Sequence, residues 1–269
     1  MQNSGCFRNH KHQGNTHAVL RELRAIEHEY AANTANRIAE EASRESSPYG
    51  LTVNDYQVLI EEDWHEILQL VSEYEEKNGK LNPDDTGNTI MAGFIKTVAN
   101  ARRNKNNESK DYGTRLNIDG FEVNSLEMSL AIAHPIEGTA YANVGILARD
   151  KALEIYTRDS CWSDGNGDAF RHISWSALLY CRFYDMHDFS HETARERALV
   201  WTNAHEGYDA NSAPSAFDES LPLVTRMDLY NNLIGFLLAE TRINLDSYSD
   251  ATIFIRAESW TDDGKGNWI

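Results

Sequence analysis

The chain has 269 residues, 41% of them apolar and 25% charged, which is the composition of a folded globular protein and excludes disorder throughout. Its 42 acidic and 25 basic residues give a formal net charge of −17, which repels phosphate backbones, so we expect no nucleic-acid partner. No run of about 18 consecutive apolar residues is present, and we expect no transmembrane segment.

The N-terminal residues 1–16 are polar, and we expect them to form a disordered tail. The first 18 residues lack the apolar segment of a secretory signal peptide, so we expect a soluble protein, either cytoplasmic or a secreted effector. The Gly5-Cys6 step resembles the scar of a lipoprotein processing site, but the missing apolar segment favours an ordinary polar tail. The three cysteines show no C-x-x-C spacing and predict no disulfide framework, and Cys181 is expected to be a buried small hydrophobe.

Helical periodicity dominates residues 17–105, which we expect to form an N-terminal helical region. The expected helices of this region cover residues 17–46, 53–77 and 86–103. A breaker around Pro48 separates the first two helices, Thr52 is placed to cap the second, and Gly79 is placed to end it in a left-handed conformation.

Residues 106–120 are polar and contain glycine, and we expect them to link the N-terminal region to a second helical domain over residues 121–269. The expected helices of this domain cover residues 125–133, 135–157, 168–186, 191–206, 223–241 and 249–260. The sequence therefore predicts an all-α protein, a multi-helix globule of orthogonal or bundle-like packing. At most a minor β-piece is expected, at the C-terminal Trp268-Ile269.

A Gly/Asp-rich loop precedes the helix expected over residues 168–186, whose first turns carry Asp168, Arg171 and His172. Asp168 and His172 are four residues apart and therefore share one helix face. At this spacing the two side chains either bind one metal ion together, or the acid orients the imidazole as a general base. Arg171 is suited to binding a carboxylate or a phosphate. In the structural alternative, Asp168 only caps the helix and His172 is a satisfied core histidine.

The apolar helix expected over residues 223–241 carries a polar stripe at helical spacing: Asp228, Asn231, Asn232 and Gly235. Buried carboxylates and amides are costly unless they have partners, and helix interiors disfavour these residue types. A glycine on this face allows another helix to approach closely. The stripe therefore predicts partners from other segments.

His205 and Glu206 end the helix expected over residues 191–206, where a histidine also has the simpler role of stabilising the helix dipole. The economical explanation is that this segment, the stripe and the Asp168–His172 pair converge on one polar pocket between helices. We therefore expect His172, His205 and Asp228 to lie within one pocket.

Three motifs carry a family resemblance: Gly-Asp-Ala-Phe-Arg-His-x-x-Trp at 167–175, Ala-His-Glu at 204–206, and Met-Asp-Leu-x-Asn-Asn-x-x-Gly at 227–235. The series resembles an uncharacterised helical domain family of bacteria, found in secreted proteins, lipoproteins and the C-terminal toxin domains of polymorphic toxins. The resemblance covers about residues 125–260 and implies no particular activity. At Tyr230 the chain departs from the family, whose members often have histidine there.

The leading hypothesis is a hydrolase-like effector or toxin domain of esterase or phospholipase type. His172 is then a general base or a metal ligand, and Asp168 orients it or shares the metal. His205 and Asp228 are further ligands or acid–base partners, and the amides of Asn231 and Asn232 donate hydrogen bonds to a developing oxyanion. With no HExxH motif and no cysteine pair, a divalent metal ion is optional; its expected ligands are Asp168, His172, His205 and Asp228.

The competing hypothesis is a noncatalytic helical interaction module. In that case the same residues form a buried hydrogen-bond network that fixes the register of the helices, and the acidic surface binds a protein partner such as an immunity protein. The two hypotheses differ in geometry, because a catalytic site needs His172 and His205 to meet at an open cleft, whereas a structural network is closed to solvent and fully satisfied.

Overall fold

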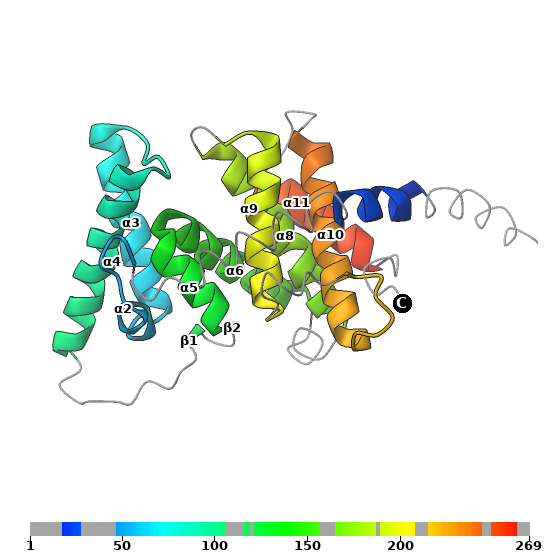
Figure 1. Cartoon of the computed structure of the whole chain (residues 1–269), viewed down its shortest axis with the longest axis horizontal. Helices are drawn as coiled ribbons and strands as arrows, with labels where there is room; N and C mark the ends of the chain where they lie inside the picture. Colours follow the sequence, from blue (N-terminus) through cyan, green and yellow to red (C-terminus); the bar gives the residue numbers. More distant parts are fainter. Residues whose placement is uncertain are drawn as a thin grey trace, which may run out of the picture.

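The computed structural model describes residues 18–27, 47–105, 116–118, 121–156, 165–186, 189–207, 215–243 and 249–262. One helix covers residues 18–27. The labelled helices are α2 (Val53–Gln57), α3 (Glu61–Asn78), α4 (Asp85–Lys105), α5 (Ser125–Ala133), α6 (Pro135–Ile155), α8 (Asn166–Asp185), α9 (His191–His205), α10 (Leu223–Ile243) and α11 (Asp250–Asp262). The protein is all-α, as the sequence predicts (Figure 1).

The single helix predicted over residues 53–77 is wrong, because the chain breaks between α2 and α3. Asp63 causes the break: its carboxylate accepts a hydrogen bond from the Ile60 amide at 2.9 Å, which starts a new helix there. Arg102 of α4 holds the same carboxylate with two donors, so the position of the second start is fixed by tertiary contact.

Two predicted helix ends are confirmed by glycines in the left-handed region. Gly79 has a φ of 87° and ends α3, and Gly207 has a φ of 77° and follows α9. Residues with a Cβ rarely adopt such angles, so both glycines have a conformational reason to be there.

A short hairpin contains the two strands found among the described residues. Strand β1 (Leu116–Ile118) pairs with β2 (Phe121–Val123) in antiparallel register, with Asn117 opposite Glu122. The first strand falls within the segment predicted to be a linker, so the sequence did not predict this hairpin. The minor β-piece was predicted instead at Trp268-Ile269, outside the described residues. Residues 106–115, 119–120 and the C-terminal 263–269 lie outside the described residues.

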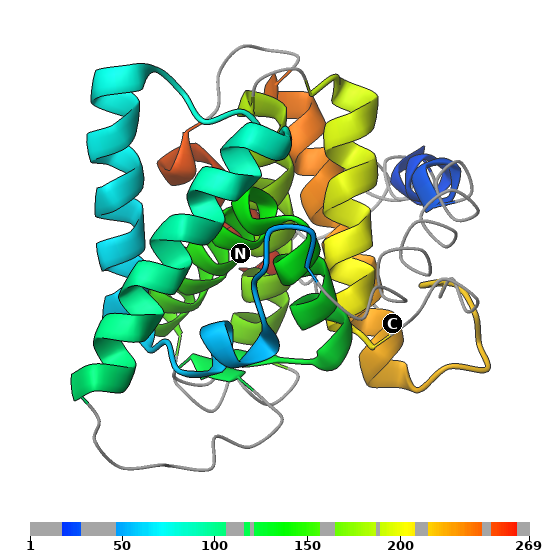
Figure 2. The same ribbon diagram turned by 60° about the vertical axis from the view of Figure 1, so that its left-hand side comes forward.

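Helix α8 is the centre of the larger part of the fold, where it packs against α6, α9, α10 and α11 (Figures 1 and 2). Its large aromatic side chains Phe170, Trp175 and Tyr180 are buried. Helix α10 lies tightly against α8 at Gly235, where an added Cβ would clash with Ser176 Oγ and lie 2.5 Å from the Ile173 carbonyl oxygen. The glycine of the polar stripe is therefore needed for helix packing, as the sequence predicts.

Helices α2–α4 cover one end of the molecule, and the helix over residues 18–27 lies at the other end, beside α10 (Figure 1). The hydroxyl of Tyr56 in α2 donates to the carbonyl oxygen of Ala131 in α5 at 2.8 Å, and Asn88 of α4 accepts from the amide of Ile136 at 3.1 Å. Within the described part of the chain, no helix is long and apolar enough to cross a membrane.

Candidate functional site

The first turns of α8 carry Asp168, Arg171 and His172, and all three side chains point into one cluster. Asp168 is the third residue of the helix, where a carboxylate interacts favourably with the helix dipole. The Arg171 Nη2 atom lies 2.5 Å from Asp168 Oδ1 and 3.3 Å from His172 Nε2. The guanidinium therefore neutralises the carboxylate and donates toward the imidazole.

Asn232 of α10 fixes the tautomer of His172. The amide oxygen Oδ1 lies 3.2 Å from His172 Nδ1, and because a carbonyl oxygen only accepts, the ring proton is on Nδ1. Burial, the Arg171 charge and the nearby His205 lower the pKa of His172 well below its ordinary value, against the opposing effect of the Asn232 hydrogen bond. His172 is therefore neutral, with the lone pair of Nε2 exposed to the cluster.

That lone pair faces two carboxylates from different helices. Nε2 lies 3.8 Å from Oδ1 of Asp168 and 3.5 Å from Oδ1 of Asp228 in α10. One ligand atom from each of the three side chains lies within 4.8 Å of the other two, and all three residues are buried. This arrangement is one of two three-residue groups, among the described residues, that offer the geometry of a metal site.

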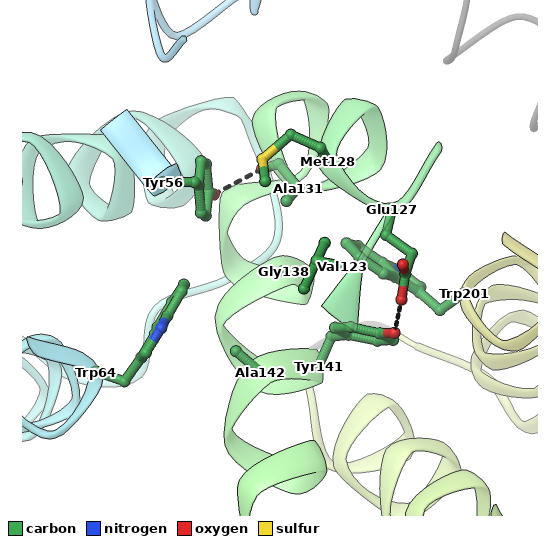
Figure 3. A pocket seen from close by; sticks show the side chains of 10 residues that line it. All are labelled: Tyr56, Trp64, Val123, Glu127, Met128, Ala131, Gly138, Tyr141, Ala142 and Trp201. Carbon is green, nitrogen blue, oxygen red and sulfur yellow. Dashed lines mark hydrogen bonds between the residues drawn. The ribbon is translucent and has the colours of Figure 1, made fainter. Parts of the chain in front are cut away.

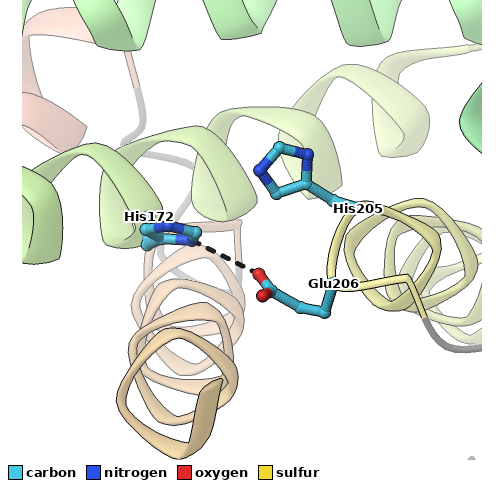
Figure 4. Close-up of side chains that lie close together, drawn as sticks. All are labelled: His172, His205 and Glu206. Atoms are coloured by element: carbon cyan, nitrogen blue, oxygen red, sulfur yellow. Dashed lines mark ion pairs between the residues drawn. The ribbon is translucent and has the colours of Figure 1, made fainter. Parts of the chain in front are cut away.

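The end of α9 brings a second histidine to the cluster. The rings of His172 and His205 lie 6.0 Å apart, and Glu206 extends its carboxylate toward His172, with Oε1 3.8 Å from Nδ1 (Figure 4). Burial raises the pKa of Glu206, with the charges of Glu127 and Asp168 adding to the effect and those of His205 and Arg171 opposing it. Its Oε1 atom is buried and has no hydrogen-bond partner among the described residues.

Glu127 holds His205 from the opposite side. His205 Nδ1 lies 2.8 Å from Glu127 Oε1, and the hydroxyl of Tyr141 in α6 contacts both of these atoms. Burial lowers the pKa of His205, but the carboxylates of Glu127 and Glu206 outweigh it and raise the pKa above its ordinary value. His205 therefore takes up a proton more readily than the neighbouring His172.

Glu127 and Tyr141 do not appear among the residues that the sequence analysis singled out. The signal for Glu127 is Asn124-x-x-Glu127, a capping box at the start of α5, in which Glu127 Oε2 accepts from the Asn124 amide. That motif predicts a helix start, and nothing in it indicates that the second carboxylate oxygen reaches His205, 78 residues further along the chain. Tyr141 has no sequence signal beyond its place in an apolar helix.

The structure brings the predicted site residues together. Those with a direct contact inside the cluster are Asp168, Arg171, His172, His205, Asp228 and Asn232. Asn231 lies next to this set on α10 and is fully buried, and neither atom of its amide has a hydrogen-bond partner among the described residues. The four predicted metal ligands do not form one group there, because His205 joins His172 and Glu206 while Asp168 and Asp228 meet on the other side of the ring.

A small cavity lies behind the Glu127–Tyr141 pair, between α2, α5 and α6 (Figure 3). It has a volume of about 20 Å³, enough for about one water molecule. Tyr56, Trp64 and Trp201 supply much of its apolar wall, and Glu127 and Tyr141 are its polar edge. The cavity is too small for a substrate.

Two side chains of the cluster keep some exposure to solvent. The side chains of Arg171 and His205 are 14% and 15% exposed, whereas that of His172 is 3% exposed. The cluster is therefore neither an open surface patch nor a closed core network.

Comparison with known proteins gives one similarity, to a family model without an assigned activity. Residues 128–260 match the model of a family described as a domain of unknown function, DUF6973. No curated protein and no solved structure matches the chain. The matched segment contains α6, α8, α9 and α10 and begins one residue after Glu127, so that the Asp168–His172–Asp228 group lies wholly inside the matched segment.

Proposed function

We propose that this cluster is the active site of a hydrolase that cleaves an ester bond. The observation that carries the proposal is a pair of histidines, with ring centroids 6.0 Å apart, whose pKa values shift in opposite directions: that of His172 is lowered and that of His205 is raised. Neighbouring titratable groups whose pKa values are pushed apart are the usual mark of an acid–base pair.

His205 is the proton-transfer residue in this proposal. Glu127 orients its ring and stabilises the imidazolium through the 2.8 Å contact, as the acid does in other acid–histidine pairs. His205 then donates a proton to the leaving oxygen through Nε2. Arg171 binds a negatively charged group of the substrate or the charge that develops in the transition state.

Unpartnered polar atoms support a site over a structural network. Among the described residues, Glu206 Oε1, both amide atoms of Asn231 and Nδ2 of Asn232 are buried without hydrogen-bond partners. A network that evolved only to fix helix register is expected to satisfy its members, because each unsatisfied buried group costs stability. Such groups are expected where a substrate, water or ion completes the set.

The setting that the motif series implies, an effector or toxin domain neutralised by an immunity protein, belongs to the same proposal. An ester or phospholipid substrate suits such a setting, and the net charge of −17 disfavours a nuclease. The interaction-module hypothesis draws on a different observation, the near-complete burial of Asp168 and His172 at 5% and 3% exposure.

A substrate panel with matched histidine variants tests the proposal. Carboxylic esters, phosphodiesters and phospholipid vesicles are offered to the wild type, His205→Gln and His191→Gln, whose substituted residue begins the same helix α9 and contacts Tyr184 instead. We expect turnover of one ester class that falls about 10²- to 10⁴-fold in His205→Gln and persists in His191→Gln. Turnover that survives in His205→Gln, or none across the panel, counts against the proposal.

A further inference from the structure

The Asp168–His172–Asp228 group has the composition of a metal centre rather than of an ion pair. Two carboxylate oxygens and one imidazole lone pair lie within 4.8 Å of one another, contributed by α8 and α10. All three are electron-pair donors, and none has a hydrogen to give to the others. Their mutual contacts at 3.5 and 3.8 Å are therefore unfavourable by themselves and call for a positive group nearby.

The second observation concerns how His172 is held. Metal-binding histidines commonly donate the hydrogen on the other ring nitrogen to a carboxylate, carbonyl or water, which fixes the tautomer and aims the lone pair. Asn232 Oδ1 supplies that contact at 3.2 Å. Asn232 is 2% exposed, and its Nδ2 has no hydrogen-bond partner among the described residues, so this buried amide is placed to orient the ring rather than to satisfy itself.

Arg171 is the positive group that the described contacts place among these donors. Its Nη2 approaches both Asp168 Oδ1 and His172 Nε2. Since its side chain is 14% exposed and lies at the solvent edge, the guanidinium can leave these atoms and turn outward when a cation takes its place.

We propose that Asp168, His172 through Nε2, and Asp228 bind one divalent transition-metal ion of the zinc or manganese kind. A mixed set of imidazole and carboxylates favours these ions over calcium and magnesium, which prefer oxygen ligands alone. Three protein ligands leave a coordination position for water, as in catalytic zinc sites. The inference deepens the proposed hydrolase and rests on it for its biological use, because a metal-bound water would supply the nucleophile, its proton passing to solvent, while His205 protonates the leaving oxygen.

Titration of the metal-free full-length protein with Zn²⁺, and separately with Mn²⁺, tests the inference by calorimetry and by thermal denaturation. We expect one metal ion to bind per chain in a saturable manner and to raise Tm, because an ion that binds only the folded state stabilises it. His172→Gln and Asp228→Asn should lose this binding. Asn232→Ala should lower the affinity for the metal ion by about 10- to 100-fold, the effect expected of a residue that orients a ligand.

His65→Gln is the matched control, since it removes an exposed histidine of α3 outside the cluster. It should leave the binding of the metal ion unchanged. Binding that persists in His172→Gln would belong to other histidines. If His172→Gln fails to fold, two other measurements test the inference: the affinity of Asn232→Ala for the metal ion, and the change in wild-type Tm when the ion is added. The inference is overturned if the wild type shows no saturable binding of the metal ion, or if His172→Gln and Asp228→Asn retain it.

The two proposals fail separately. A protein that binds the ion in this manner but hydrolyses nothing in the panel keeps the metal site and loses the hydrolase. A protein whose turnover needs His205 but is unchanged after chelation keeps the hydrolase and loses the metal site.

Discussion

The two ring nitrogens of His172 face partners of different kinds, and this asymmetry organises the site. Nδ1 is held by an amide oxygen of α10, and Nε2 faces the two carboxylates. A histidine that served only the core would be expected to face donors alone at its lone pair, whereas here one donor, Arg171 Nη2 at 3.3 Å, shares that space with two carboxylates. Elsewhere in the molecule a buried charge has that kind of environment: Glu137 accepts from Arg197 through two nitrogens and from Trp201 Nε1.

Replacing these two buried acids by their amides should therefore have opposite results. Asp228→Asn reduces the repulsion in the cluster, so the Tm of the metal-free protein should stay the same or rise. Glu137→Gln leaves Arg197 as a buried charge without its counterion, which costs about 3–5 kcal/mol, so Tm should fall by several degrees or more. Thermal denaturation of both variants beside the wild type is the measurement. A large fall in Asp228→Asn would show that Asp228 is a structural member of the network.

Cys181 gives a separate prediction about the core of α8. Its side chain is 1% exposed, and burial raises the pKa of the thiol to about 12. Since the thiolate is the reactive form, the native thiol should be inert. In a Cys6→Ser, Cys161→Ser variant, Ellman's reagent should detect no thiol near pH 8 until denaturant is added, and then one per chain. Rapid reaction in the native state would contradict the packing of α8.

At the scale of single elements, periodicity and end signals predicted most helices of the described chain, because both are local. Periodicity placed α4, α5, α8, α9 and α10 within a few residues of their bounds. Periodicity did not predict the break before α3, because Val58, Leu59 and Ile60 continue the apolar pattern. The break depends on the carboxylate of Asp63, which caps the start of α3. Hydrophobic spacing carries no information about such a competing hydrogen bond.

The residues of the candidate site likewise fall into those that local sequence patterns predict and those that depend on tertiary contacts. Its α8, α9 and α10 residues could be predicted because polar groups at helical spacing within apolar helices need an explanation. Glu127 could not, because its local role as a helix cap already accounts for it and its contact with His205 depends on the tertiary fold. Which side of the His172 ring each acid faces likewise depends on how α10 crosses α8.

The close packing of α10 against α8 predicts the effect of replacing Gly235. In Gly235→Ala the new Cβ would meet Ser176 Oγ and the backbone of α8, and such overpacking costs about 1–3 kcal/mol despite the better helix propensity of alanine. Gly93→Ala is the matched control, since an added Cβ on α4 meets nothing within 4 Å. It should stabilise the protein by about 0.5–1 kcal/mol. Urea denaturation measures both; equal effects would mean that α10 does not approach α8 at Gly235.

At the scale of the whole molecule, the family match covers residues 128–260, but contacts from outside that range complete the fold. Helices α2 and α4 hydrogen-bond to α5 and α6, which adjoin the site. On the other side, the helix over residues 18–27 holds the segment that leads into α10: Glu27 accepts from the Ser215 hydroxyl at 2.7 Å and from the Ala216 amide at 2.6 Å. Arg24 lies over the ring of Phe217 in the same segment.

Glu27 makes this long-range contact sensitive to pH. Burial raises the pKa of its carboxyl above the ordinary value of 4.5, against the opposing effects of Ser215, Ala216 and Arg24. The folded protein therefore binds the proton more tightly than the unfolded chain, so the stability from this group is fully present below pH 4.5 and is lost as pH rises through the folded-state pKa. Glu27→Gln has no such loss. The Tm of the variant minus that of the wild type should therefore increase as pH is raised from 4 to 7, and should not change at higher pH. Glu22→Gln, which removes an exposed carboxylate from the same helix, is the matched control and should follow the wild type. A Glu27→Gln difference that is independent of pH would mean that the helix over residues 18–27 does not bury this carboxyl against residues 215 and 216.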